Sequence, residues 1–90
     1  MLDEDDEKLV ALVTGAGRPT GIGFEVARQL AQHGMRVVLT ARRLSDAEAR
    51  TAALRAAGLD VVAAELDVVT PTSIQRVAEA FSRIDVLVNN

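Results

Sequence analysis

Three glycines, at positions 15, 21 and 23, stand between a short apolar run and a segment with helical periodicity. Gly15 can form the tight turn after a strand, Gly21 can let the backbone approach a pyrophosphate, and Gly23 can let a helix press onto a sheet. The free N–H groups and the positive dipole end of that helix would then face the phosphates. Glycines also end strands for purely structural reasons, but this position between a buried strand and a helix favours a phosphate-binding turn.

Four short motifs follow one another along residues 9–90. They are Thr-Gly-Ala with Gly-Ile-Gly (14–16 and 21–23), Thr-Ala-Arg (40–42), Leu-Asp-Val (66–68) and Asp-Val-Leu-Val-Asn-Asn (85–90). In order and spacing they resemble the short-chain dehydrogenase/reductase family, whose members transfer hydride between a nicotinamide cofactor and a carbonyl or alcohol carbon. The resemblance implies the NAD(P)-binding portion of such an oxidoreductase, with Gly15, Gly21, Ile22 and Gly23 at the cofactor.

The glycine-rich turn departs from the family pattern. The family usually places three residues between its first two signature glycines, whereas five residues separate Gly15 from Gly21 here. An insertion of two residues that includes a proline should enlarge or stiffen the turn over the pyrophosphate. Within this turn, Arg18 could reach a phosphate by its position and charge, or it could be an exposed loop arginine.

The end of the second apolar run bears on the choice of cofactor. A carboxylate there would hydrogen-bond the ribose 2′-hydroxyl of NAD and would repel a 2′-phosphate. Ala41 stands where family members that use NAD tend to carry this acid, and Arg42 and Arg43 follow it. Arginine suits bidentate contact with a phosphate, although a basic pair can also be a solvated feature of a loop. The missing acid and the two arginines together predict NADP as cofactor, with NAD less favoured.

The last two motifs supply further cofactor-binding candidates by resemblance. Asp67 and Val68 would border the adenine, with the Asp67 carboxylate near its exocyclic amine. Asn89 resembles the first Asn of the family's Asn-Asn-Ala-Gly segment, which lines the cofactor cleft and ties neighbouring strands together. Without the resemblance, Asp67 would be a polar residue at a strand end, and the two asparagines would form a turn.

No catalytic residue is predicted in this chain. The family's acid/base tyrosine and its partner lysine have no counterpart, because the chain has no tyrosine and its only lysine, Lys8, precedes the first apolar run. We therefore expect residues 9–90 to be the N-terminal half of a dinucleotide-binding Rossmann domain, truncated after the fourth strand and inactive alone. A carbonyl or alcohol substrate would bind only in the complete protein. The alternative is a non-catalytic dinucleotide-binding or subunit-pairing half-domain.

Other chemistry is disfavoured. A metal site is not predicted, because the single histidine, His33, and the scattered carboxylates show no ligand spacing. His33 stands just before Gly34, where a helix end and its dipole favour a structural role. A Rossmann methyltransferase would usually carry an acid for the ribose hydroxyls at the end of the second strand, and Ala41 followed by Arg42 argues against it.

An alternating series of strands and helices must position these candidates. Short apolar runs at 9–13, 36–41, 61–66 and 86–88 predict buried strands. A first helical pattern begins at residue 22 and stops at Gly34. A second begins at a capping box formed by Ser45 and Glu48 and stops at Gly58. A third begins at Pro71. Such connections imply parallel pairing with right-handed crossovers. The sequence therefore predicts an α/β protein, a partial Rossmann fold whose doubly wound parallel sheet has four strands in the order 3-2-1-4 and three helices.

Charge and composition limit the partners. Five of the thirteen acidic residues lie at positions 3–7, and the remaining eight are outnumbered by ten lysines and arginines. We expect residues 1–8 to be an acidic, disordered tail and residues 9–90 to form one domain. The chain has no cysteine, which fits a reducing cytoplasm. It has only two aromatic residues, too few for a platform that stacks nucleic-acid bases, and no apolar run long enough to span a membrane. We therefore expect a cytoplasmic protein without nucleic-acid or membrane partners. An open sheet edge and an unfilled face predict self-association or a missing C-terminal half as partner.

Overall fold

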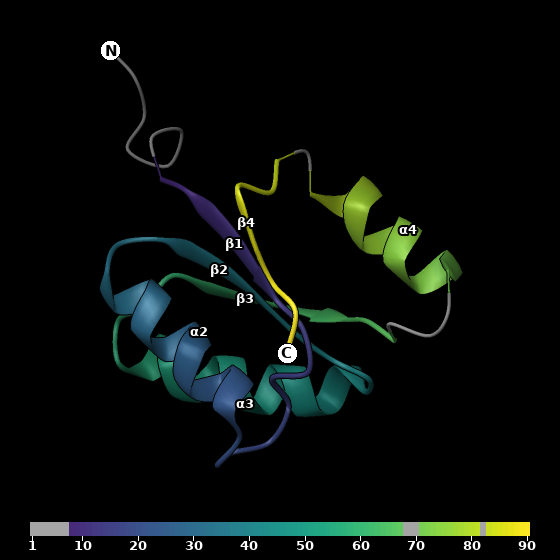
Figure 1. Ribbon diagram of the computed structural model, residues 1–90. Coiled ribbons are helices and arrows are strands. Elements are labelled where there is room, and N and C mark those ends of the chain that lie inside the picture. The colour runs from purple at the N-terminus through teal and green to yellow at the C-terminus, as the bar shows by residue number, and fades with distance from the viewer. Residues whose placement is uncertain (1–7, 68–70, 82) are drawn as a thin grey trace.

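A parallel sheet of four strands forms the centre of the molecule and carries helices on both faces (Figure 1). The computed structural model describes residues 8–67, 71–81 and 83–90, so the expectations for Val68 and for most of the acidic tail lie outside the described residues. The strands are β1 (Val10–Val13), β2 (Arg36–Ala41), β3 (Val61–Glu65) and β4 (Val86–Val88). The helices are α2 (Ile22–Gln32), α3 (Leu44–Ala56) and α4 (Pro71–Ala80). Within the described ranges, no helix has the length and apolar character that crossing a membrane requires.

The strand order is β3-β2-β1-β4, and all three pairings are parallel. One helix lies between each pair of strands that follow one another in the sequence. This arrangement confirms the predicted Rossmann-like α/β fold and its strand order. Because the strands are parallel, their carboxyl ends share one edge of the sheet, which is where ligands bind in open α/β folds.

Helices α2 and α3 cover one face of the sheet (Figure 1). Small side chains make this contact, since Ala27 and Ala31 of α2 and Ala47 of α3 are all buried. They pack against a cluster of strand residues that includes the fully buried Val37 and Leu39. Methyl groups in place of longer side chains let both helices lie close to the strands at the density of a protein interior.

Helix α4 lies on the opposite face (Figure 1). Its Val77 is 6% exposed and packs with Leu12 of β1 and Val38 of β2. Leu87 of β4 is the register partner of Leu12 and therefore shares its face, but it is 63% exposed. Two helices therefore cover one face of the sheet and one covers the other, and the α4 face leaves a large apolar side chain of β4 uncovered.

The start of α3 differs from the prediction. A capping box would make Ser45 the N-cap and bring Glu48 back to it. Instead, Arg43 is the N-cap and no side chain caps the helix. The N–H groups of Asp46 and Ala47 both donate to the carbonyl oxygen of Arg43, at 3.1 and 3.2 Å. The first turn thus forms two residues earlier than the capping box requires, and that prediction is wrong.

Candidate functional site

The turn that follows β1 lies at the carboxyl edge of the sheet. Gly15 has a φ of +64°, a left-handed conformation that residues with a side chain rarely adopt. The chain then crosses to β2, where the N–H of Ala16 donates to the carbonyl oxygen of Thr40 (2.8 Å). The tight turn predicted at Gly15 is therefore present in the backbone.

The start of α2 lies directly against this turn. Gly21 is the N-cap of α2, and Gly23 is buried in its first turn. A Cβ atom at Gly23 would lie 2.7 Å from Asn90 Nδ2, 3.0 Å from the carbonyl oxygen of Gly15 and 3.1 Å from Ala16 Cα. Only a glycine permits an approach this close. The first N–H groups of α2 have no carbonyl partner within the helix, so they can bind an anion at this end.

Thr14 joins the end of β1 to the end of β4. Its N–H donates to the carbonyl oxygen of Val88 (3.0 Å), and its hydroxyl accepts from the N–H of Asn90 (3.0 Å). The hydroxyl also lies 3.3 Å from Asn89 Oδ1, to which it can donate. Asn90 Nδ2 completes the joint by donating to the carbonyl oxygen of Gly15 (3.1 Å). Asn89 was a predicted site residue, whereas Thr14 and Asn90 were not, although both stand beside predicted residues in their motifs.

The widened glycine-rich turn lies on the end of β2. A Cβ atom at Gly17 would lie 2.7 Å from Ala41 Cβ and 3.2 Å from Asp46 Cβ. Further along the turn, the N–H of Gly21 donates to the carbonyl oxygen of Arg18 (3.2 Å), and the Arg18 side chain is exposed. The turn therefore touches both the end of β2 and the start of α3. This role of Gly17 was not predicted, because the motif treats it only as one residue of an enlarged turn.

The end of β2 carries a buried alanine followed by two exposed arginines. Ala41 is 4% exposed and belongs to the core beneath α2 and α3, whereas Arg42 and Arg43 are exposed. In the part of the chain that the structure describes, neither guanidinium group has a bonding partner. Asp46, in the first turn of α3, adds one carboxylate beside them. This stretch of the edge thus offers two cations and one anion to a ligand.

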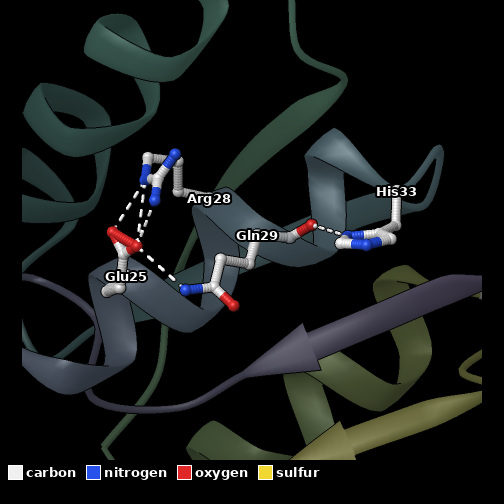
Figure 2. Close-up of polar contacts among 4 residues, drawn as sticks. All are labelled: Glu25, Arg28, Gln29 and His33. Carbon is white, nitrogen blue, oxygen red and sulfur yellow. Dashed lines mark hydrogen bonds and ion pairs between the residues drawn. The ribbon is translucent and has the colours of Figure 1, made fainter.

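Arg28 offsets the charge of Glu25, the acidic residue in the first turn of α2 (Figure 2). Glu25, in the first turn, accepts hydrogen bonds from Arg28 Nε (2.7 Å) and Gln29 Nε2 (3.1 Å). The bonds from Arg28, and then from Gln29, lower the pKa of Glu25 to about 2. The carboxylate is therefore charged at neutral pH, but the guanidinium group beside it offsets that charge. The amino end of α2 can consequently still attract a phosphate.

His33 lies at the other end of α2. It is the C-cap residue of the helix, and its Nδ1 lies 2.7 Å from the carbonyl oxygen of Gln29, to which it donates (Figure 2). The contact supports the structural role that the sequence predicts for this histidine. Within residues 8–67, 71–81 and 83–90, no group of three or more His, Cys, Asp or Glu side chains could hold a metal ion.

The remaining predicted residues lie at the same edge. Ile22 is the first residue of α2 and is 75% exposed. Asp67 follows Leu66, whose N–H donates to the carbonyl oxygen of Ala41 (2.9 Å), so Asp67 lies where β3 ends beside β2. Val68 lies outside the described residues. The other predicted site residues are all at strand ends, at the start of α2 or in the turn between them.

The amino ends of the strands carry a separate group of charges. Asp60 accepts hydrogen bonds from Lys8 Nζ and Arg36 Nε, both at 3.1 Å. Burial raises the pKa of Asp60, but these two bonds outweigh it, and the pKa lies below its ordinary value. The pKa of Asp85 is also lowered, chiefly because the carboxylate accepts a hydrogen bond from the N–H of Val10 (2.8 Å). Both acids join segments that are distant in the sequence, so they stabilise the sheet at the edge opposite the candidate site.

Residues 9–90, which include this edge, are similar to known proteins. A sequence model described as short chain dehydrogenase matches residues 9–90. The (+)-neomenthol dehydrogenase of Arabidopsis thaliana is 44% identical over 88 residues, which cover 89% of this chain and 29% of that protein. The chain thus spans less than a third of the length of this relative.

Two solved structures have a similar fold. Menthone neomenthol reductase from Mentha piperita is 35% identical, with a TM-score of 0.80 over 93% of this chain and 31% of that one. A metagenomic short-chain oxidoreductase in complex with NADP is 40% identical, with a TM-score of 0.75 over 88% of this chain and 37% of that one. In both, the similarity covers nearly the whole of this chain but only about a third of the other protein.

Proposed function

Because the chain belongs to the short-chain dehydrogenase family, we propose that residues 9–90 bind the adenosine and phosphate portion of NADP in an oxidoreductase. The family binds a dinucleotide cofactor, and one similar protein was solved with NADP. The observation that carries the proposal is the close approach at Gly23, which puts the start of α2 against the turn after β1. Exposed arginines follow at the next strand end. One edge of the sheet therefore combines a helix amino end, a glycine turn and exposed cations.

The residues at this edge suit each part of the cofactor. The pyrophosphate would lie against the backbone from Gly21 to Gly23, where helix N–H groups are available. The 2′-phosphate would bind Arg42 and Arg43, and the adenine would lie beside Asp67. When bound, the nicotinamide supplies hydride to a carbonyl carbon or takes it from an alcohol carbon. The task of this chain is to hold and orient the cofactor for that transfer.

The alanine at position 41 bears on the choice between NADP and NAD. Its Cβ lies only 2.7 Å from where a Cβ at Gly17 would be, and the residue is 4% exposed. A buried alanine at position 41 places no acid there to repel a 2′-phosphate, and the exposed Arg42 and Arg43 are the main support for NADP. NAD is the second candidate, because Asp46, whose Cβ lies close to Gly17, is the acid in the first turn of α3, and a carboxylate can accept a hydrogen bond from the ribose 2′-hydroxyl.

Replacing the arginines tests the proposed cofactor. We expect Arg42→Ala and Arg43→Ala each to raise the Kd for NADP about tenfold, because each would lose a charge-assisted hydrogen bond to phosphate. The Kd for NAD, which has no 2′-phosphate, should be nearly unchanged. Isothermal titration of the naturally expressed protein measures both constants. Arg55→Ala is the control, because Arg55 is an exposed arginine in the last turn of α3.

Equal losses of NADP and NAD affinity would contradict a 2′-phosphate site at the arginine pair. If Asp46→Asn instead weakens NAD and leaves NADP unchanged, NAD becomes the preferred cofactor. A protein that binds neither dinucleotide would overturn the proposed function altogether.

The proposal assigns hydride transfer to the family chemistry and no catalytic residue to this chain, which has no tyrosine. A carbonyl or alcohol compound would be the substrate. The alternative is a non-catalytic dinucleotide-binding or subunit-pairing domain. Oxidation of NADPH in the presence of carbonyl compounds distinguishes them: turnover by the naturally expressed protein supports the oxidoreductase, and binding without turnover supports the alternative.

Two broader expectations belong to the same proposal. We expect the α4 face to associate with a second copy or with further polypeptide, since Leu87 of β4 is 63% exposed there. Size-exclusion chromatography of Leu87→Lys should then show less association than the unaltered protein. The absence of cysteine agrees with a reducing compartment, and cell fractionation would test a cytoplasmic location.

A further inference from the structure

The outer side of β3 is open. Among the described residues, β3 is an end strand of the sheet and pairs only with β2. The N–H of Val37 in β2 donates to the carbonyl oxygen of Asp60 (3.0 Å), so the amide groups of this residue point toward β2. In a strand of a parallel pair, the amide groups of successive residues point to opposite sides. The amide groups that point away from the sheet therefore belong to Val61, Ala63 and Glu65.

The composition of β3 does not protect this open side. The strand reads Val-Val-Ala-Ala-Glu, with no proline and no lysine, and its charge is confined to the last residue. Residues 62–64 are only partly buried. Natural proteins protect end strands with charged side chains, proline or bulges, because unpaired amide groups are a template for pairing with another chain. The outer side of β3 therefore has the properties of a strand-pairing surface.

Helix α3 flanks the open side of β3. A groove of about 740 Å³ lies between the two elements, and the residues of α3 that line it include Glu48, Ala52 and Arg55. Their spacing of four and then three residues puts them on one flank of the helix. Val62 and Ala63 line the groove from β3. Any chain that pairs with β3 would therefore also meet this flank of α3.

Opposite charges stand at the two ends of this flank. Glu48 and Arg55 are exposed, and neither has a bonding partner in the part of the chain that the structure describes. They are about two helical turns apart, roughly 10 Å along the axis, which is too far for a direct ion pair. A second α3 that runs antiparallel beside the first would put its arginine against Glu48 and its glutamate against Arg55. The flank is therefore complementary to itself.

One twofold axis suits both the strand and the helix. In antiparallel pairing of two β3 strands, the three outward-pointing residues meet in reverse order, so the centre of the pairing is Ala63. On α3, the midpoint between the two charges falls between Thr51 and Ala52. These three residues line the same groove, so both centres lie at one place. Twofold symmetry requires a surface that is complementary to itself in this way.

We propose that the groove between α3 and β3 binds the same groove of a second copy of this chain. The two β3 strands pair antiparallel, and Glu48 of each copy lies against Arg55 of the other. This inference does not rest on the proposed function, because none of the proposed cofactor-binding residues lines the groove. It is also distinct from the association expected at Leu87, which belongs to β4 at the other end of the strand order.

Reversing the charges one at a time tests the proposal in the naturally expressed protein. Glu48→Arg and Arg55→Glu each turn two ion pairs of the dimer into two like-charge contacts. Each variant should therefore raise the Kd for self-association about tenfold. In an equimolar mixture of the two variants, every contact again joins opposite charges, so association should return. The double variant should also associate as the unaltered protein does, and sedimentation velocity measures all four samples.

The matched control is Ala53→Arg. It adds a charge at an exposed position of α3 that does not line the groove, so it should leave the Kd for self-association unchanged. Ala63→Pro examines the strand, because proline removes an outward N–H that β2 does not use. We expect about tenfold weaker association and an unchanged Kd for NADP. If Ala63→Pro fails to fold, the charge variants carry the test.

The outcomes separate this inference from the other proposals. A monomeric unaltered protein would overturn it, and so would association that neither charge reversal changes. Loss of association in both single variants without recovery in the mixture or the double variant would show a structural defect, which also overturns it. If the unaltered protein binds no dinucleotide but the mixed variants recover association, the proposed function fails and this inference stands.

Discussion

The two edges of the sheet use charge in opposite ways. At the amino edge, Asp60 is bonded to Lys8 and Arg36, and Asp85 accepts the N–H of Val10. At the carboxyl edge, the arginine pair after β2 is exposed and has no partner among the residues that the structure describes. Paired charges stabilise the folded chain without a ligand, whereas neighbouring cations repel each other until an anion binds. The carboxyl edge is therefore where binding can add stability that the protein alone lacks.

The largest expected effect comes from the carboxyl edge, at Gly23. Gly→Ala within a helix normally stabilises by about 1 kcal/mol. At Gly23 the new methyl group would meet Asn90 Nδ2 at 2.7 Å and the Gly15 carbonyl oxygen at 3.0 Å. We expect a net loss of about 1 to 2 kcal/mol in the free energy of unfolding, together with loss of NADP binding. Urea unfolding and titration calorimetry measure the two effects.

The control for Gly23→Ala is Ala52→Gly, at an exposed position within α3. It should cost about 1 kcal/mol through helix propensity and leave the Kd for NADP unchanged. Stabilisation by Gly23→Ala would contradict the close approach of α2 to the turn, and with it the difference between the two edges.

A smaller effect is expected at the amino edge, at Asp60. Asp60→Asn removes the charge that Lys8 and Arg36 share. Because these pairs are partly exposed, we expect the free energy of unfolding to fall by only about 0.5 to 1 kcal/mol. The Kd for NADP should not change, since this residue lies at the opposite edge from the candidate site. An altered NADP affinity would show that the two edges are coupled.

The smallest effect is a dependence on acid pH. The pKa values of Asp60 and Asp85 are lowered in the folded protein, so their contribution to stability is complete above the unfolded-state value of about 4 and is lost as the pH falls through the folded-state value. We expect the urea midpoint to be level from about pH 7 to 5 and to fall below that. Asp85→Asn should reduce the fall, and an unchanged acid profile in this variant would contradict the pairing.

The fold could be predicted because its signals are local. Apolar runs bounded by turn residues located all four strands, and the strand–helix alternation implied parallel pairing. The stops predicted at Gly34 and Gly58 are confirmed by φ values of +88° and +84°. The capping box at Ser45 failed because α3 starts with backbone hydrogen bonds to Arg43, which side-chain spacing does not reveal.

The candidate site was predictable only in part, because topology fixes where strands end but not the path of the loop between them. Parallel strands bring the ends of separate motifs to one edge, so the positions of Gly15, Arg42 and Asn89 followed from the topology. The contact of Gly17 with Ala41 did not, since it depends on the path of an enlarged turn that the motif does not describe. Tertiary packing, rather than residue type, decides which side chains fit there.

The joint between β1 and β4 has a consequence for how the chain is made. Thr14 and Asn89 meet across 75 residues of sequence, while β2, the other neighbour of β1, follows it much sooner. Synthesis begins at the N-terminus, so β1, β2 and β3 are present while β4 is still to be made. During that interval β1 has one unpaired edge, a surface that strands of other chains can join. A slower ribosome would prolong this exposure, which ends when β4 has been made and pairs with β1.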